Sequence, residues 1–331
     1  MISFASNDYL GLSVHPEVIA GASAALQRWG AGAGSARLIV GSRPVHTRLE
    51  AELADWKSAD AAVLFPNGYA ANLGVLQTFG SRDVLICSDE LNHASIIDGS
   101  RMARARVAVY PHKDLSRLAR LLKDNDRTIV VTDTVFSMDG DVAPVEDIAE
   151  LCRSHGSLLV IDEAHAVLGP FPQLDGVEAV RVGTLSKFLG AAGGFVAGHA
   201  EFIELLINRA RTFIFTTAAP PADAGAALAA LRILRSEEGA LLQRRLRANI
   251  DAIAPQNPSP IVPVIVGDES AALEAAARLL DLGFLVPAIR PPSVPAGSAR
   301  LRVALSAAHE PAQVEALRAA LAQVVAEPAH A

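Results

Sequence analysis

The residue with the clearest chemical potential is the lysine in VGTLSKFLGAAGG, the run from Val182 to Gly194. Lys187 is the only charged residue of this run. Burying a lysine ammonium without a partner is costly, because desolvation destabilises the charge, so two interpretations are open. Either the run is a surface loop, or the amine is tied up chemically. Since most lysines are solvated, the run alone favours the loop.

An acid and a histidine precede this lysine along the chain. Asp162 ends the apolar run LLVID, and His165 follows three residues later. Such an acid can simply cap the next turn, and D-E-x-H also resembles part of a metal site, although no third ligand is nearby. A third interpretation is a carboxylate that keeps a heterocyclic nitrogen protonated. Together with Lys187 it predicts pyridoxal 5'-phosphate, a cofactor that needs an amine for its Schiff base and an acid at its ring nitrogen.

The phosphate of that cofactor requires hydrogen-bond donors, and the stretch FPNGYAANLG can supply them. Here a strand turns through an Asn-Gly pair into a helix. The amides of Gly68, Tyr69 and Ala70 would then lie in the first turn, where N–H groups are free and the helix dipole favours an anion. Ordinary strand-to-helix turns look the same. Thr184 would add a hydroxyl to the same phosphate.

Two more polar residues follow apparent strand ends. His93 in SDELNHASIID is either a polar loop residue or an imidazole stacked on the pyridine ring. Ser137 in TVFSMDGD would reach the phenolic oxygen of the ring together with His165. Because glycine has no Cβ, the lysine run also predicts close approach of the cofactor to the backbone at Gly190, Gly193 and Gly194.

The predicted cofactor residues must lie close together in space, so the fold has to bring the ends of several strands to one place. Short apolar runs alternate with helical patterns such as HTRLEAELADWK and LSRLARLLKD, and they lie at 61–65, 84–89, 106–111, 128–136 and 157–165. Apolar strands separated by helices predict an α/β fold with a mainly parallel sheet flanked by helices. Ligands of such sheets bind at the carboxyl ends of the strands. Asp162 ends the strand LLVID within one of these runs, and Lys187 lies just past a further apparent strand, VRVGT. Asp162 and Lys187 are therefore expected at one edge of one sheet.

The sequence changes in character after residue 219. A long alanine- and leucine-rich helix is expected over about 220–253, followed by a strand in SPIVPVIVG, a helix over 270–282, the strand ARLRVALS and a closing helix. We expect a large cofactor-binding domain over 1–219 and a smaller C-terminal α/β domain over 220–331. The terminal EPAHA is expected to fray.

Composition narrows the class of protein. The chain has 331 residues, is 51% hydrophobic and 20% charged, and has a net charge of −7. It lacks the basic stripe that a nucleic-acid partner requires, and no apolar run approaches the ~18 residues of a membrane span. The start, MISFASNDYLGL, has no signal-peptide pattern, and Cys87 and Cys152 have no ligand spacing. We expect a cytoplasmic protein without nucleic-acid, membrane or metal partners.

Taken together, the motifs resemble the α-oxoamine synthase family of fold-type I pyridoxal-phosphate enzymes. The resemblance runs from SNDYLGL to RLRVALSAAHE and includes NHAS, VFSMDGD, the D-E-A-H at 162–165, the T-L-S-K at 184–187 and AIRPPSVPAGSARLR. It implies that the catalytic residues are Lys187, His93, Asp162 and His165. It implies cofactor contacts from Gly68, Tyr69, His93, Ser137, Asp162, His165, Thr184, Lys187, Thr216 and Thr217, and substrate contacts from Arg290, Ser293 and Asn7.

The resemblance also implies an activity. This is a decarboxylative condensation of L-alanine with a pimeloyl thioester of coenzyme A or acyl carrier protein, which gives 8-amino-7-oxononanoate in biotin biosynthesis. Arg290 would pair with the amino-acid carboxylate, and Thr216 or Thr217 would reach the neighbouring phosphate across a homodimer with active sites at the interface. Alternatives are a sister activity such as glycine C-acetyltransferase, or a non-catalytic paralogue that acts as a binding partner.

Overall fold

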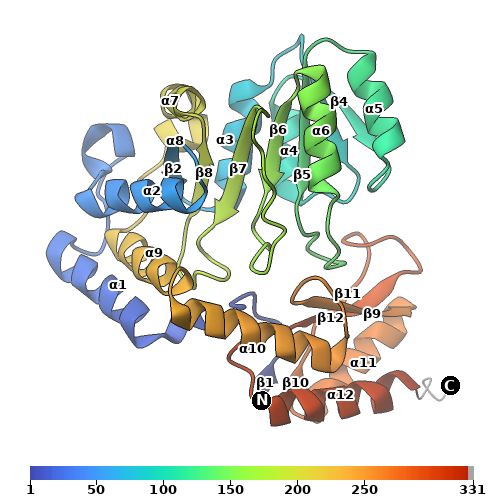
Figure 1. Cartoon of the computed structure of the whole chain (residues 1–331). Helices are drawn as coiled ribbons and strands as arrows, with labels where there is room; N and C mark the ends of the chain where they lie inside the picture. The colour runs from blue at the N-terminus through green and yellow to red at the C-terminus, as the bar shows by residue number, and fades with distance from the viewer. Residues whose placement is uncertain (327–331) are drawn as a thin grey trace. The chain divides into compact units, whose positions relative to one another are not determined.

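The structure is a computed structural model that describes residues 1–326 (Figure 1). The expected fraying of EPAHA lies outside these residues. The chain divides into two compact units: residues 1–11, 137–142 and those from 236 onward form the first, and residues 12–136 and 143–235 form the second. This division differs from the expected boundary after residue 219. Helix α9 (Pro221–Leu234) packs on α1 (Pro16–Trp29) and α2 (Pro44–Trp56), and it therefore belongs to the second unit.

The second unit is built on a seven-stranded sheet with the order β2-β8-β7-β6-β5-β3-β4. Its strands are β2 (Ala61–Phe65), β3 (Leu85–Asp89), β4 (Arg106–Tyr110), β5 (Thr128–Asp133), β6 (Leu158–Asp162), β7 (Ala179–Thr184) and β8 (Gly194–Gly198). All neighbours pair in parallel except β8, which is antiparallel to both β2 and β7. The predicted mainly parallel sheet is confirmed, and β8 is the strand that the sequence did not indicate.

Alternate residues of the central strands face two separate cores. On β6, Val160 packs into one core, whereas Leu159 and Ile161 pack into the other. Helices α3 (Gly68–Phe79), α4 (Ala94–Met102), α7 (Ala200–Arg209) and α8 (Arg211–Ile214) contribute to the first core, and α5 (Leu115–Lys123) and α6 (Val145–His155) to the second. Figure 1 shows helices on both faces of the sheet. The strands are apolar on both sides because both sides are covered.

The parallel strands end together at one edge of this sheet. Asp133, the last residue of β5, pairs with Asp162, the last residue of β6, and Asp162 pairs in turn with Val182 on β7. Turns that follow the strands therefore start from neighbouring positions. The second unit also contains a single 3-10 turn, η1 (Leu12–Val14), and a π-helical turn, η2 (Arg37–Gly41).

In its described residues, the first unit contains two small sheets and three helices. Strand β1 (Ile2–Ser3) pairs in parallel with β10 (Phe284–Leu285), and β12 (Ala299–Ala304) lies between β11 (Ala288–Ile289) and β9 (Ile261–Gly267) in an antiparallel sheet. Its helices are α10 (Glu237–Ile253), α11 (Glu269–Asp281) and α12 (Pro311–Ala326). The expected helix over 220–253 is in fact two helices. Ser236 interrupts it, because its side chain accepts the Gly239 N–H and caps α10.

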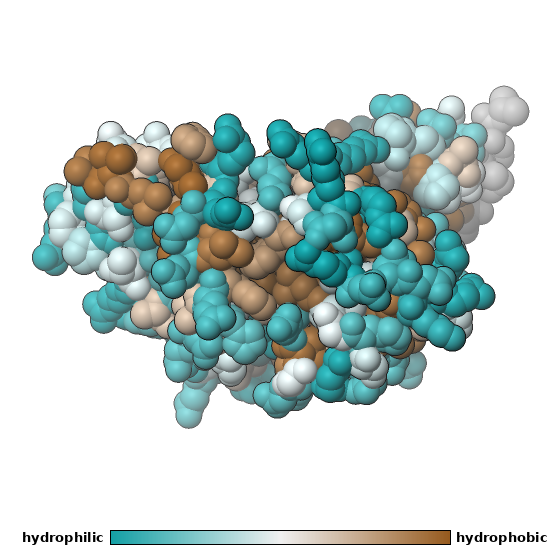
Figure 2. Space-filling model, turned by 90° about the horizontal axis from the view of Figure 1, so that it is seen from above, coloured by the Kyte–Doolittle hydropathy of each residue, from teal (hydrophilic) through white to brown (hydrophobic). Residues whose placement is uncertain are grey.

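Hydrophobic side chains also reach the surface. Figure 2 shows brown groups of hydrophobic residues among hydrophilic ones on the face that it presents. In the second unit the exposed hydrophobic residues include Leu38, Ile39, Val40 and Phe215, the last of which is 70% exposed. Exposing apolar side chains to water is unfavourable, and contiguous exposed apolar patches are typical of a surface that meets a partner.

Two features of other protein classes are absent from residues 1–326. No helix in this part of the chain combines the length and the apolar composition needed to cross a membrane. Nor do these residues include a group of three or more His, Cys, Asp and Glu placed to hold a metal ion. Cys87 and Cys152 are free, buried thiols, and burial raises the pKa of each to about 12.

Candidate active site

Lys187 and His165 meet at the carboxyl edge of the large sheet. Lys187 lies in the turn after β7 and is partly buried, and His165 lies in the turn after β6 and is 4% exposed. The Lys187 Nζ atom is 2.9 Å from Nε2 of His165. An amine and an imidazole at this distance can share or exchange a proton. Lys187 is therefore not a solvated loop lysine.

Asp162 ends β6 at the same edge of the sheet and is 6% exposed. Two donors hold its carboxylate. Oδ1 accepts the Ala164 N–H at 2.9 Å, and Oδ2 accepts Nδ2–H of Asn72 at 2.6 Å. The carboxylate is thus fixed in one orientation at the edge of the sheet.

His93 is linked to the same carboxylate through two buried residues. The Asn72 amide nitrogen is also 2.9 Å from Ser95 Oγ, and Ser95 Oγ is 2.8 Å from Nδ1 of His93. The Ser95 N–H points to the same Nδ1 at 3.2 Å. His93 keeps part of its side chain exposed. Partial loss of solvent lowers the pKa of the imidazole, with a smaller opposing effect from Asp162.

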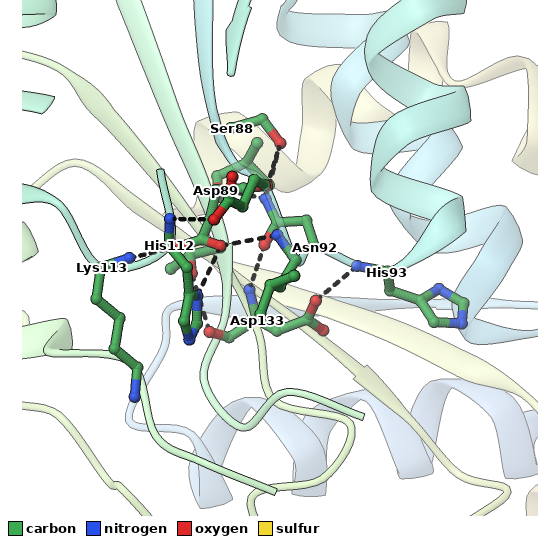
Figure 3. A network of polar contacts seen from close by, with 11 residues as sticks. Ser88, Asp89, Asn92, His93, His112, Lys113 and Asp133 are labelled. Atoms are coloured by element: carbon green, nitrogen blue, oxygen red, sulfur yellow. Dashed lines mark hydrogen bonds and ion pairs between the residues drawn. The ribbon is translucent and has the colours of Figure 1, made fainter. Parts of the chain in front are cut away.

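A second network holds the backbone that carries His93 (Figure 3). Asp133 Oδ2 accepts the His93 N–H at 2.7 Å, and the His93 imidazole points away from this bond. Asn92 accepts the Asp133 N–H at 3.0 Å and donates to Ser88 Oγ and the Val131 carbonyl, both at 2.8 Å. Asn92 therefore ties the ends of β3 and β5 together, and this fixes where His93 begins α4.

This network contains two buried carboxyl groups, those of Asp89 and Asp133. Asp89 Oδ1 lies 2.9 Å from Nδ1 of His112, and Asp89 Oδ2 accepts the Lys113 N–H at 3.0 Å. Asp133 is 3% exposed, and burial raises its pKa well above the usual range. The negative charge of Asp162 raises that pKa further, against the opposing effect of the His93 N–H.

The first turn of α3 offers donors, although fewer than predicted. Asn67 caps the helix, and its Oδ1 accepts the Ala70 N–H at 2.8 Å. The prediction that the Ala70 amide is available to a phosphate is therefore wrong. Gly68 and Tyr69 precede it, in positions whose N–H groups have no partner within a helix. The Tyr69 hydroxyl donates to Asp98 at 2.5 Å.

Thr184 contacts the start of α3, but its hydroxyl already makes a hydrogen bond within the protein. A Cβ at Gly68 would lie 3.4 Å from Cβ of Thr184, so the two residues are in contact. The Thr184 hydroxyl donates to the Gly193 carbonyl at 3.0 Å. The exposed Ser186 places its Oγ 2.8 Å from Thr184 Oγ1. Ser186 was missed in the sequence, where it reads only as one more small residue beside the lysine.

The glycines after Lys187 lie in tight contact with other parts of the chain. A Cβ at Gly194 would clash with the backbone of Asn67, and a Cβ at Gly190 would clash with the backbone of Ser13. Gly190 also has φ +61°, which disfavours other residues. These glycines therefore permit close packing of protein backbone against protein backbone.

Four predicted site residues belong to the first unit. Arg302 joins two of them, because its Nε donates to the Ser137 carbonyl at 2.6 Å and its two Nη groups each lie 3.3 Å from Oδ1 of Asn7. Arg290 and Ser293 are exposed in the segment after β11, where the Ser293 N–H donates to the Arg290 carbonyl. Sequence reasoning missed Arg302. Its signal was the pair of arginines, Arg300 and Arg302, in the strand ARLRVA, because buried arginines need partners.

A buried ion cluster supports the turn that follows Asp162. Glu163 is 2% exposed and lies 2.7 Å from Lys57 Nζ and 2.5 Å from Nη1 of Arg181. Burial alone would raise the pKa of Glu163, but the charges of Lys57 and Arg181 outweigh it and hold that pKa below its usual value. One anion between two cations therefore anchors the backbone between Asp162 and His165.

The fold and the site define a transferase of the fold-type I pyridoxal-phosphate class. The chain belongs to the aminotransferase class I and II family, whose model matches residues 1–321. Among curated relatives it is 49% identical to the 8-amino-7-oxononanoate synthase of Anaeromyxobacter dehalogenans, a match covering 98% of this chain and 86% of the relative. It is 45% identical to the enzyme of that name from Bordetella petrii, over 100% of this chain and 90% of the relative.

Solved structures agree with this assignment. A serine palmitoyltransferase from S. paucimobilis, with bound PLP–myriocin aldimine, superposes with a TM-score of 0.92 at 29% identity and covers 98% of this chain and 87% of its own. The 8-amino-7-oxononanoate synthase of Francisella tularensis superposes with a TM-score of 0.80 at 27% identity and covers 98% of both chains. The predicted family and fold class are confirmed.

Proposed function

We propose that this chain is a pyridoxal-phosphate-dependent acyltransferase that makes 8-amino-7-oxononanoate for biotin biosynthesis. The reaction joins Cα of L-alanine to the carbonyl carbon of a pimeloyl thioester. The C–S bond breaks and releases the thiol, and the alanine carboxylate leaves as carbon dioxide. The observation that carries the proposal is the contact between Lys187 Nζ and His165 Nε2 at the sheet edge where Asp162 ends β6. The relatives that share nearly the whole chain support the choice of reaction.

The residues of the second unit fit the cofactor chemically. Lys187 would hold it covalently, and Asp162, a carboxylate fixed by two donors, would hold a proton on its ring nitrogen. The amides of Gly68 and Tyr69 suit a phosphate dianion, with a hydroxyl from Thr184 or Ser186 beside them. When bound, pyridoxal phosphate supplies an electrophilic carbon and a ring that accepts electrons.

The chain's own groups would then position the substrates and move protons. Lys187 would remove the Cα proton of alanine, and His165, 2.9 Å from it, would adjust the protonation of its amine. His93 would stack on the ring, and Ser137 and His165 would meet its phenolic oxygen. In the first unit, Arg290 would pair with the substrate carboxylate, and Asn7 and Ser293 would contact substrate. General acid–base help of this kind contributes roughly 10²–10⁴ in rate.

The proposal includes a homodimer with active sites at the interface. Thr216 and Thr217 would donate to the phosphate of the neighbouring subunit. Phe215, which precedes them, is 70% exposed, and the exposed Leu38–Val40 segment belongs to the same unit. These apolar side chains would be removed from water by a second copy. We place the enzyme in the cytoplasm, where its two free thiols stay reduced.

Borohydride reduction followed by peptide mass mapping tests the proposal most directly. We expect a phosphopyridoxyl group on Lys187 and on no other lysine. In Lys187→Ala the adduct should be absent and turnover lost. An adduct elsewhere, or full activity of Lys187→Ala, would contradict the assignment.

A steady-state assay with alanine, glycine and serine against a panel of acyl thioesters tests the reaction itself. We expect the highest kcat/KM for alanine with the pimeloyl thioester. A preference for glycine with a short acyl group would favour the sister activity, and no turnover with any pair would favour a non-catalytic paralogue.

A further inference from the structure

Two buried polar residues connect His93 to Asp162. The connection runs from Asp162 Oδ2 to Asn72 Nδ2, from there to Ser95 Oγ, and on to Nδ1 of His93, with separations of 2.6, 2.9 and 2.8 Å. Asn72 and Ser95 are each 1% exposed, so water does not compete for these bonds. Asn72 lies on α3 and Ser95 on α4, while Asp162 ends β6.

The direction of each bond follows from which atoms carry hydrogen. An ionised carboxylate only accepts, so Asn72 must present its NH₂ group to Asp162, and the second hydrogen of that group goes to Ser95 Oγ. The orientation of the Asn72 amide is thereby set, because the flipped form would face oxygen to oxygen. Its Oδ1 is buried without a hydrogen-bond partner among the described residues. An unsatisfied buried acceptor is costly, so the two bonds made by the NH₂ group must outweigh it.

The same reasoning fixes the tautomer of the His93 imidazole. A backbone N–H can only donate, and the Ser95 N–H points at Nδ1 of His93 at 3.2 Å. Ser95 Oγ already accepts from Asn72, which leaves its own hydrogen for Nδ1. Nδ1 therefore receives hydrogen bonds and carries no proton, and the ring proton of neutral His93 lies on Nε2.

From this geometry we infer that Asn72 and Ser95 are positioning residues, which hold His93 as its neutral Nε2–H form and fix it relative to Asp162. The inference rests on the proposed function in so far as His93 stacks on the cofactor. Desolvation, which lowers the pKa of His93, acts in the same direction. A neutral ring with one defined N–H keeps a flat apolar face for stacking and a single directed donor.

A simpler explanation is that His93 only caps α4. Its side chain accepts the Ser95 N–H, as N-cap residues do. That explanation gives no role to the Ser95 hydroxyl or to Asn72. The two explanations therefore differ in what Ser95→Ala and Asn72→Ala do to the ring of His93.

The test is nitrogen NMR of the holoenzyme labelled with ¹⁵N-histidine. Two-bond ¹H–¹⁵N correlations distinguish an acceptor nitrogen from an N–H nitrogen, and His93→Gln identifies the signal. In the wild-type protein near neutral pH we expect Nδ1 at an acceptor position and Nε2 as the protonated nitrogen. In Ser95→Ala and Asn72→Ala we expect both signals to move toward the average of the two tautomers, and Ser95→Thr should restore the wild-type pattern.

Ser100→Ala is the matched control. Ser100 lies on the same helix, is 2% exposed, and its hydroxyl has no hydrogen-bond partner in the described part of the chain. We expect the His93 signals of Ser100→Ala to match those of the wild-type protein. The inference is overturned if wild-type His93 carries its proton on Nδ1, or if both Ser95→Ala and Asn72→Ala leave the His93 signals where Ser100→Ala leaves them. Because the readout is a tautomer and not turnover, failure of the proposed function would appear separately, in the Lys187 adduct.

Discussion

The carboxyl group of Asp133 is buried beside a second carboxylate, that of Asp162. Its pKa in the folded protein lies well above 3.8, first because of burial and then because of its neighbour. Between the unfolded and the folded pKa the native state binds more protons than the unfolded state. Stability should therefore fall as pH rises through that window, by up to about 1.4 kcal/mol per pH unit.

Asp133→Asn removes this dependence and keeps an oxygen that can accept the His93 N–H. We expect a flatter dependence of the unfolding free energy on pH from about pH 4 upward, and greater stability near neutrality. Urea unfolding at a series of pH values measures both. Asp126→Asn on the surface is the control. A slope in Asp133→Asn equal to that of the wild type would show that Asp133 does not titrate in this window.

The Glu163 cluster leads to a second prediction for a single residue. Lys57→Met removes one of two cations and leaves a buried carboxylate under-compensated, which typically costs about 3–5 kcal/mol. Arg127→Met, which breaks the exposed pair with Asp83, should cost far less, because solvent screens an exposed ion pair. Urea unfolding of the two variants compares the two losses of stability. Equal losses would mean that the cluster contributes no more than a surface pair.

Some site residues were readable from the sequence and others were not. Asp162 ends one recognisable strand and Lys187 follows another, so their placement at one sheet edge could be predicted before the structure. Asn72 could not, because its partners come from α4 and β6, and only the folded chain brings them together. Which hydroxyl beside the helix start stays available, Thr184 or Ser186, depends on a bond to Gly193 that has no sequence signal.

Among the helices, the contact between α1 and α9 depends on two glycines. A Cβ at Gly225 would lie 2.5 Å from the Gly21 carbonyl oxygen and 2.7 Å from the Ala25 Cβ. Gly225→Ala gains about 0.5–1 kcal/mol of helix propensity, but overpacking typically costs about 1–3 kcal/mol. We expect a net loss of stability in chemical unfolding. Gly32→Ala, where no atom lies within 4 Å, should be neutral or slightly stabilising, and equal behaviour of the two would contradict tight packing.

Some helices and strands could be predicted correctly from the sequence, and others could not. Strand β2 matches the apolar run at 61–65, because such runs between helical patterns are strong signals. Strand β8, GFVAG, was missed, because its two glycines weaken the strand pattern and it follows a glycine-rich loop. The helix expected over 220–253 divides at Ser236. Residues on both sides favour helix, so only the cap shows the break.

For the whole molecule, the proposed homodimer makes a prediction about assembly. Phe215→Asp places a charge where we expect an apolar interface, and it should shift sedimentation from dimer toward monomer. Phe171→Asp is the control, since Phe171 is also exposed, at 57%, but lies away from Thr216 and Thr217 in the sequence. A wild-type protein that sediments as a monomer with full activity would contradict the proposal.

The two buried thiols have a practical consequence. Cys87 on β3 and Cys152 on α6 both belong to the core that α5 and α6 cover. A thiol reacts as the thiolate, and with a pKa near 12 neither group ionises appreciably in the native protein at neutral pH. Modification by a thiol reagent must therefore wait until this layer opens. The rate of thiol modification therefore measures how often this face of the sheet unfolds locally, and the measurement needs no introduced cysteine.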